Sequence, residues 1–200
     1  MDDILEFINF HLNNLVPRPV LFKDPIFIEA AFDSTVADFQ YHYPDTGPDK
    51  IKNEIFTNMS LGHYLYRLVR ELHLRGTEDR IKYQIHHIMK VLCGCEIYWS
   101  ADIGEGFHID HGMSTVIGSR CKIGKGFWIH HGCTVGHRSV TDFGEGPTIG
   151  DDVILYANSH IFGDITVGNK TVIGANSTVV SSTQGHELVC GNPAKRIKKL

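Results

Sequence analysis

The sequence predicts a parallel β-helix preceded by a helical domain, and three observations support this fold class. Between about residues 101 and 180 an aliphatic residue recurs every six positions. A glycine or small polar residue usually follows it, as in Ile103-Gly104. Residues 1–95 instead contain few glycines and show helical spacing. A period of six fits neither the 3.6 residues of a helical turn nor strand alternation, but it is the hexapeptide signature of a parallel β-helix.

The repeat continues long enough to build a self-supporting solenoid. About twelve units form roughly four triangular coils, in which neighbouring coils share one core. The repeated aliphatic positions are Ile103, Ile109, Ile117, Ile123, Ile129, Val135, Ile149, Leu155, Ile161, Val167, Ile173 and Val179. Four residues after most of them comes a slim residue that we expect to point inward: Cys121, Cys133, Ser139, Val153, Ser159, Thr171 or Ser177.

The first 95 residues read as an α-helical domain. An amphipathic stretch covers residues 4–15, and a second helix opens at Asp24-Pro25 and stops before Pro44. A third helix is predicted over residues 51–74 and a fourth over 81–92. The β-helix domain then covers 96–194, and residues 195–200 form a basic C-terminal tail.

Composition narrows the class of protein. The formal net charge of −4 provides no electrostatic footprint for nucleic acid. No apolar run is long enough to span a bilayer, and the acidic start Met1-Asp2-Asp3 is unlike a signal peptide, so no membrane association is expected. Five cysteines, an odd number, argue against a disulfide framework. We therefore expect Cys121 and Cys133 to be core thiols and the protein to be cytoplasmic.

Histidines are dense in the repeat and define the candidate site. His111 and His131 each stand two residues after an aliphatic position of the same face, so they should lie one strand spacing apart in adjacent coils. Ala157 takes the same column one coil further on, and Asp110 and His130 form a neighbouring column. Such a ladder is not a tetrahedral cage, so no metal site is expected.

One insertion interrupts the repeat. Val135 to Ile149 carries about eight more residues than the period allows, and the excess is the segment 137–147. Insertions in solenoids project as loops, often from the binding face. We expect this loop to leave the coil beside His131 and His111 and to bring His137 and Arg138 to the site, although a surface loop without function is the alternative.

These residues resemble the serine acetyltransferases. The resemblance rests on Gly106-Phe107-His108-Ile109-Asp110-His111-Gly112, on Cys133-Thr134-Val135-Gly136 followed by the extruded loop, and on Pro147-Thr148-Ile149-Gly150. It covers about residues 96–194 in motif. It implies a left-handed parallel β-helix with an all-helical N-terminal domain, and transfer of an acetyl group from acetyl-CoA to a hydroxyl.

The resemblance also implies roles for individual residues. His111 matches the histidine that acts as general base, which a weakly nucleophilic hydroxyl requires. Glu96 stands where the family has an aspartate that orients this histidine, and it is one methylene longer. Asp110 matches an aspartate that binds the acceptor. We expect direct attack on the thioester, without an acyl-enzyme and without a metal.

Acetyl-CoA is expected to lie in a groove between neighbouring subunits of a trimer, as in the family. Small residues and free backbone groups around Gly136 and Ala157 would pair with the pantetheine arm, and Lys195 and Arg196 would bind the phosphates. A solvated basic tail is the alternative for the last two. The resemblance also allows a dimer of trimers formed through the helical domain.

Departures from the family concern the acceptor. The family has an Arg-His pair at the end of the loop, where this chain has Glu145-Gly146. Arg138, at the start of the loop, could bind a carboxylate instead. The acceptor-binding aspartate of the helical domain corresponds loosely to Asp45 or Asp49. The chain stops at Leu200 without the tail by which the family docks to cysteine synthase, so that complex is not expected.

Three functions remain in competition at this stage. The first is O-acetylation of serine or a similar small hydroxyl acceptor, which the helical N-terminal domain favours. The second is O-acetylation of a sugar or secondary metabolite on the same scaffold, which the loss of the basic pair favours. The third is a non-catalytic β-helix, and the presence of His111, Asp110 and Glu96 argues against it.

Overall fold

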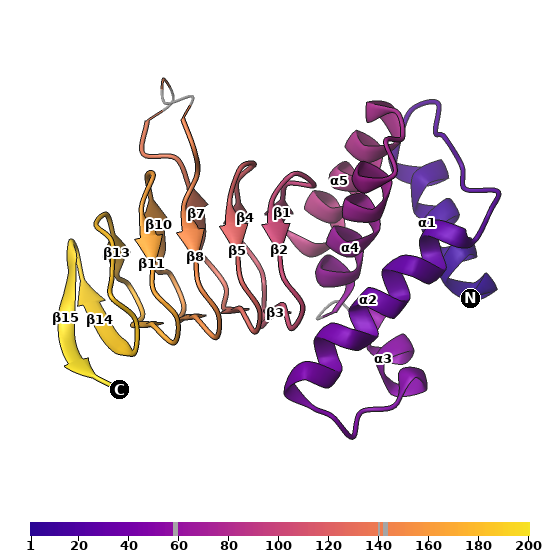
Figure 1. The fold of residues 1–200 in the computed structure, drawn as a ribbon. Coiled ribbons are helices and arrows are strands. Elements are labelled where there is room, and N and C mark those ends of the chain that lie inside the picture. The colour runs from indigo at the N-terminus through magenta and orange to yellow at the C-terminus, as the bar shows by residue number, and fades with distance from the viewer. Residues whose placement is uncertain (58–59, 140, 142–143) are drawn as a thin grey trace.

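The computed structural model describes residues 1–57, 60–139, 141 and 144–200. Helices make up the first part of the chain and short strands the second (Figure 1). The helices are α1 (Asp2–Leu15), α2 (Ile26–His42), α3 (Pro48–Ile55), α4 (Leu61–Leu74) and α5 (Asp79–Cys93). None of the helices in these residues is both long and apolar enough to cross a membrane.

The predicted helices are found, except that one of them is divided into two in the structure. A single helix over residues 51–74 was wrong, because α3 ends at Ile55 and α4 begins at Leu61. Asn58 and Met59, which the predicted helix included, lie outside the described residues. No proline or glycine marks this break in the sequence. The break lets α3 pack against the end of α2 while α4 packs against both α2 and α5.

The strands form the three faces of a left-handed parallel β-helix, as predicted. Sheet A contains β1 (Glu96–Ile97), β4 (Val116–Ile117), β7 (Thr134–Gly136), β10 (His160–Phe162) and β13 (Thr178–Val179). Sheet B contains β2 (Asp102–Ile103), β5 (Lys122–Ile123), β8 (Thr148–Ile149) and β11 (Thr166–Val167). Sheet C contains β3 (His108–Ile109), β6 (Trp128–Ile129), β9 (Ile154–Leu155), β12 (Val172–Ile173), β14 (Glu187–Gly191) and β15 (Ala194–Lys199).

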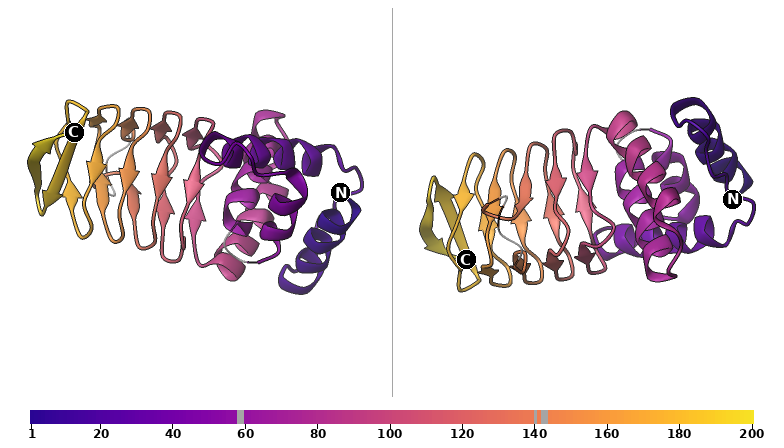
Figure 2. Two further views of the ribbon diagram at one scale, coloured as in Figure 1. Left: turned by 90° about the horizontal axis from the view of Figure 1, so that it is seen from below. Right: turned by 90° about the horizontal axis from the view of Figure 1, so that it is seen from above.

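The coils stack along one axis, with the helices at one end (Figure 2). The other end is closed by β15, which pairs antiparallel with β14, whereas the other strand pairings within the described residues are parallel. Residues 195–199 of the expected basic tail are therefore part of a strand and not a free tail. The reversal begins at Asn192-Pro193, whose peptide bond is cis.

The core follows the repeat. All twelve repeated aliphatic side chains are buried, and so are Cys121, Cys133, Val153, Ser159, Thr171 and Ser177 in the slim column. Ser139 was wrongly assigned to this column: it is exposed, because the extra residues of the loop begin right after β7. In the first two coils Phe107 and Phe127 fill the interior, one in each coil, and stack with ring centroids 6.2 Å apart.

A buried polar network joins the helices to the first coil. Asp38 on α2 accepts hydrogen bonds from Arg67 Nε and His63 Nε2 on α4, each at 2.6 Å. Its carboxylate also accepts one from the backbone N–H of Gly106, at 2.8 Å. Arg67 donates in turn to the carbonyl of Ile103, at 2.9 Å. This network fixes the helical domain relative to the coil that carries Asp110 and His111.

Candidate active site

His111 stands out from the turn that connects sheet C to sheet A. Ile109 points into the core, so the following Asp110 faces outward, whereas His111 faces outward because the chain turns there. His111 and Gly112 both have left-handed backbone conformations, with φ of 63° and 53°. This is uncommon for a residue with a side chain, and the tight turn leaves 61% of the His111 side chain exposed. The site therefore presents an accessible imidazole.

Asp110 lies between two histidines. Its Oδ1 is 3.5 Å from His111 Nε2, and its Oδ2 is 3.7 Å from His130 Nδ1. Burial lowers the pKa of His130, and Asp110 only partly opposes this effect. The ring of His130 stacks on Tyr156 at 5.1 Å. One carboxylate is thus close to an exposed imidazole and to a second imidazole held against an aromatic ring.

The predicted histidine ladder is present. The rings of His111 and His131 lie 5.9 Å apart, because β3 and β6 pair with Ile109 opposite Ile129. Nδ1 of His131 is buried and has no hydrogen-bond partner in the part of the chain that the structure describes. Ala157 continues the column, since Leu155 pairs with Ile129. No three His, Cys, Asp or Glu side chains of the described residues are placed to hold a metal ion.

Glu96 makes contacts other than the expected one. Its Oε1 is 2.9 Å from Lys90 Nζ and 3.9 Å from His86 Nε2, both on α5. Among the described residues it forms no ion pair with His111. Glu96 begins β1, whose partner β4 follows the turn of His111, so the two residues belong to neighbouring segments. The structure brings Glu96 to this end of the site but couples it to α5.

A pocket of about 280 Å³ opens on the other side of Asp110. It lies between the α2–α3 segment and sheet C, and its lining residues are Phe39, Tyr43, Thr46, Lys50, Glu54, His108, Asp110 and Trp128. Asp45 and Asp49, the two expected acceptor-binding aspartates of the helical domain, do not line it. The nearby residues Thr46 and Lys50 do.

Sequence reasoning missed most of this pocket. His108 and Trp128 each precede a repeated aliphatic residue, and the register of β3 and β6 places them side by side with ring centroids 4.1 Å apart. That shared outward column could have been read from the repeat. Lys50 and Glu54 are four residues apart on α3 and so share a helix face, but nothing in the sequence placed that face against sheet C.

The extruded loop emerges at a different corner from the histidine ladder. It joins β7 in sheet A to β8 in sheet B and projects away from the coils (Figure 1). His111, His131 and Ala157 lie instead at the corner between sheets C and A. Within one chain the loop is therefore not beside His111, contrary to expectation. Val140, Asp142 and Phe143 of the loop lie outside the described residues.

The two ends of the loop are packed differently. At its start, both ring nitrogens of His137 are buried and lack hydrogen-bond partners among the described residues, while Arg138 is exposed beside Gly163. At its end, Glu145 pairs with Lys122 at 3.0 Å. A Cβ on Gly146 would lie 2.7 Å from the carbonyl oxygen of Arg120. Where the family has its basic pair, this chain therefore has a glutamate that forms an ion pair and a glycine that packs closely against the backbone.

Gly136 and Ala157 also lie at different corners. Gly136 ends β7 at the corner where the loop leaves, and a Cβ added there would meet nothing within 4 Å. Ala157 lies between β9 and β10, at the corner of the histidine ladder. One chain does not bring them together, so a groove that used both would need two copies.

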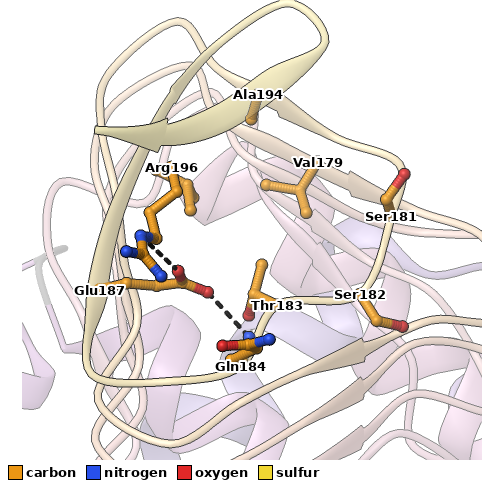
Figure 3. Close-up of a pocket in the computed structure, with 9 residues that line it drawn as sticks. Val179, Ser181, Ser182, Thr183, Gln184, Glu187, Ala194 and Arg196 are labelled. Atoms are coloured by element: carbon orange, nitrogen blue, oxygen red, sulfur yellow. Dashed lines mark hydrogen bonds and ion pairs between the residues drawn. The ribbon is translucent and has the colours of Figure 1, made fainter. Parts of the chain in front are cut away.

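The basic residues near the C-terminus have unequal surroundings. Arg196 Nε is 3.8 Å from Glu187, whose other carboxylate oxygen accepts a 2.8 Å hydrogen bond from the backbone N–H of Gln184 (Figure 3). These three residues line a cavity of about 260 Å³ under β15, together with residues such as Val179 and Thr183. Lys195 is exposed on the same strand. The charge of Arg196 is therefore partly neutralised and that of Lys195 faces solvent.

Comparison with known proteins supports the resemblance seen in the sequence. Residues 146–181 match the family described as bacterial transferase hexapeptide (six repeats). The serine acetyltransferase of Staphylococcus epidermidis is 34% identical over 139 residues, which are 70% of this chain and 62% of that protein. The serine acetyltransferase of Staphylococcus xylosus is 36% identical over 115 residues, which are 58% of this chain and 53% of that protein. The chain spans less than two thirds of the length of these curated relatives.

Solved structures of serine acetyltransferases share the fold. That of the Neisseria gonorrhoeae enzyme superposes with a TM-score of 0.75 at 24% identity, over 96% of this chain and 77% of that one. The structure of a serine acetyltransferase in complex with CoA superposes with a TM-score of 0.68 at 22% identity, over 87% of this chain and 70% of that one. The helical part and the β-helix of this chain are therefore arranged as in those proteins.

Proposed function

We propose that this chain, which is similar to serine acetyltransferases in sequence and in fold, is an acetyl-CoA-dependent O-acetyltransferase acting on serine or a similar small hydroxyl acceptor. The observation that carries the proposal is the exposed imidazole of His111, with the Asp110 carboxylate at 3.5 Å and a pocket adjoining that carboxylate. A base beside an acceptor pocket is what acylation of a hydroxyl requires.

The chemistry is direct transfer. His111 accepts the proton of the acceptor hydroxyl as its oxygen attacks the thioester carbonyl of acetyl-CoA. The tetrahedral intermediate then collapses, the carbon–sulfur bond breaks, and the proton passes from His111 to the departing CoA thiolate. Asp110, and Glu96 in the orienting role predicted for it, would stabilise the imidazolium between these steps.

The two cysteines in the core of the coils, Cys121 and Cys133, support a mechanism without an acyl-enzyme. Burial raises the pKa of the Cys121 thiol to about 12 and also raises that of Cys133. A thiol must ionise to act as a nucleophile. Both side chains lie in the core of the coils, where a substrate has no access.

We further propose that acetyl-CoA lies in a groove between two chains of a homotrimer. Gly136 and Ala157 lie at different corners of the coil, so adjacent copies could place one of each along the same pantetheine arm. The open space beside Gly136 fits such a neighbour. Lys195 and Arg196 would bind phosphates, and Lys195 is the better placed because Glu187 faces Arg196. His131, His137 and Arg138 would contact the acceptor, the latter two from the neighbouring chain.

A sugar or secondary metabolite is the second candidate acceptor. Tyr43, Trp128 and Phe39 give the pocket aromatic walls, which suit the apolar face of a sugar ring. The loop end, where the family has a basic pair, carries Glu145-Gly146. Thiol release measured with L-serine and with a panel of sugars separates the two candidates.

The test of the base is substitution of His111. We expect His111→Ala to lower kcat by about 10²- to 10⁴-fold, the usual contribution of general acid–base catalysis. CoA binding and the circular dichroism spectrum should be unchanged. His87→Ala, an exposed histidine of α5, is the matched control and should keep full activity. Turnover retained in His111→Ala would remove His111 from the mechanism, and a scaffold without catalysis would release no thiol with any acceptor.

A further inference from the structure

Two of the five cysteines lie close together where the helical domain passes into the β-helix. Cys93 ends α5 and Cys95 precedes β1, with only Gly94 between them. Both are free thiols, and the proposed acetyl transfer uses neither. Cys95 is buried, with 3% of its surface exposed, whereas Cys93 is half-buried. A solute can therefore reach the pair from the side of Cys93.

The backbone brings the two sulfur atoms to the same place. Gly94 is the C-cap of α5 and has a left-handed conformation, with φ of 62°, which a glycine adopts without strain. A Cβ on Gly62 of α4 would lie 3.0 Å from Cys95 Sγ and 3.6 Å from Cys93 Sγ. Both sulfurs thus converge on one point above α4, and they fit there because Gly62 has no side chain.

The Cys93 thiol is held in its protonated form. A hydrogen bond with the Cys95 thiol, and then burial, raise the pKa of Cys93. A thiol with a raised pKa is a poor nucleophile at neutral pH. A metal ion overcomes this obstacle, because it displaces the protons and binds the thiolates. The pair is therefore better suited to metal ligation than to nucleophilic attack.

We propose that Cys93 and Cys95 form a binding site for a soft divalent metal ion such as Zn²⁺ or Cd²⁺. Two metal–sulfur bonds form as the two thiols release their protons to solvent. Bonds of about 2.3 Å bridge sulfurs that are up to about 4.6 Å apart. Thiolates select such ions over Mg²⁺ and Ca²⁺, which prefer oxygen ligands.

The charge of the product suits this position. Two thiolates and a divalent ion carry no net charge, so no unpaired charge is buried and no anion is placed at the C-terminus of α5. Water completes the coordination on the half-buried side of Cys93. With two protein ligands, the site is consistent with the lack of three-residue metal clusters in the described part of the chain.

The site adjoins the turn that carries His111. The backbone N–H of Ser114 donates a 2.8 Å hydrogen bond to the carbonyl of Gly94. Met113 packs over the same glycine, with its Cγ 4.0 Å from the position of a Cβ. Two metal–sulfur bonds would shift this glycine and the turn that it holds. Metal binding should therefore lower turnover, an effect that rests on the proposed function, whereas the binding itself does not.

Titration of the reduced full chain with Cd²⁺ tests the site. We expect one Cd²⁺ per chain, seen as an ultraviolet thiolate-to-metal charge-transfer band, and displaced by Zn²⁺ but not by Mg²⁺. Cys93→Ser and Cys95→Ser should each weaken binding by at least about 100-fold, more than the loss of a residue that only orients a ligand. Cys190→Ser, which removes a half-buried cysteine of β14 at the far end of the coils, is the matched control and should bind Cd²⁺ as the unsubstituted protein does.

Equal Cd²⁺ binding by the unsubstituted protein, Cys93→Ser and Cys95→Ser would overturn the inference. An unsubstituted protein that does not bind Cd²⁺, or one whose binding is lost in Cys190→Ser, would also overturn it. Circular dichroism checks that the variants fold, and Cys93→Ser is the milder change because Cys93 is half-buried.

Turnover is measured separately, as loss of the acetyl-CoA thioester, because the released CoA thiol itself binds Cd²⁺. Cd²⁺ should lower the turnover of the unsubstituted protein and leave that of Cys93→Ser unchanged. Turnover that is unaffected while Cd²⁺ is bound would overturn the link to the His111 turn. A chain that binds Cd²⁺ through both thiols but consumes no acetyl-CoA with any acceptor would keep the metal site and remove the proposed function.

Discussion

At the scale of single residues, Asp110 is the point where the two halves of the site meet. One of its carboxylate oxygens faces His111, and the same side chain lines the pocket formed with α2 and α3. Its position follows from the repeat, since the residue after an inward aliphatic must point outward. A group bound to Asp110 is therefore close to the proposed base.

Glu96 provides a prediction at the same scale. If its carboxylate orients His111, Glu96→Gln should lower kcat by about tenfold or more with little change in either KM. Glu96→Asp, which restores a carboxylate and matches the family's residue, should recover most of the loss. Steady-state kinetics on both variants measures the effect.

Lys90→Met is the control, because it removes the 2.9 Å ion pair that couples Glu96 to α5 but leaves the carboxylate. Unchanged kcat in Glu96→Gln, or equal losses in Glu96→Gln and Lys90→Met, would assign Glu96 to anchoring α5.

At the scale of elements, the contact between α2, α4 and the first coil depends on Asp38. Burial raises the pKa of this carboxyl, but hydrogen bonds and charges from His63 and Arg67 outweigh it, so the net pKa lies below the ordinary value of 3.8. A carboxyl with a lowered folded-state pKa stabilises the fold above its unfolded-state pKa and loses this contribution as pH falls through the folded-state value. Asp38 therefore stabilises the fold at neutral pH.

We expect Asp38→Asn to lower the free energy of unfolding by about 3–5 kcal/mol at pH 7, because Arg67 becomes an uncompensated buried charge. The difference from the unsubstituted protein should begin to shrink below about pH 4, where Asp38 of the unfolded chain becomes protonated, and should shrink further as pH falls through the lowered folded-state pKa of Asp38. Urea unfolding at several pH values measures both effects. Asp33→Asn, an exposed aspartate of the same helix, is the control and should change little. A difference independent of pH would mean that the charge of Asp38 is not what stabilises the contact.

At the scale of the whole molecule, one hydrophobic core runs from the helices into the coils. Buried residues form a single cluster from Ile4 on α1 to Val189 on β14. The candidate site is nevertheless divided between corners, with the histidine ladder at one and the loop at another. A rigid solenoid cannot bend to bring these corners together, so a second copy is the simplest way to complete the site.

The molecular mass in solution tests this. Light scattering should give about three times the 22.5 kDa of one chain, or six times for a dimer of trimers. Arg138→Ala should then raise the KM for the acceptor and leave the trimer intact, if the loop of one chain reaches the site of the next. An active monomer would contradict a site shared between chains, and an unchanged KM would leave Arg138 outside the site.

The sequence by itself determined the β-helix and the histidine ladder. A six-residue period fixes which side chains point inward, and the parallel stacking of coils then places every equivalent position in a column. The burial of all twelve aliphatic residues and the 5.9 Å spacing of His111 and His131 follow from that rule. Local signals also made two helices predictable: α1 has amphipathic spacing and ends before Pro17, and α2 begins directly after Pro25.

Only the tertiary structure decided where separate elements meet. The pairing of Glu96 with Lys90, the corner from which the loop leaves, and the pocket that joins Lys50 to Asp110 all depend on how the helices dock on the first coil. No local pattern specifies that docking, because it is set by buried contacts between residues far apart in sequence, such as Asp38 with the backbone of Gly106. The repeat determines columns within the solenoid, whereas packing across the domain contact determines what those columns face.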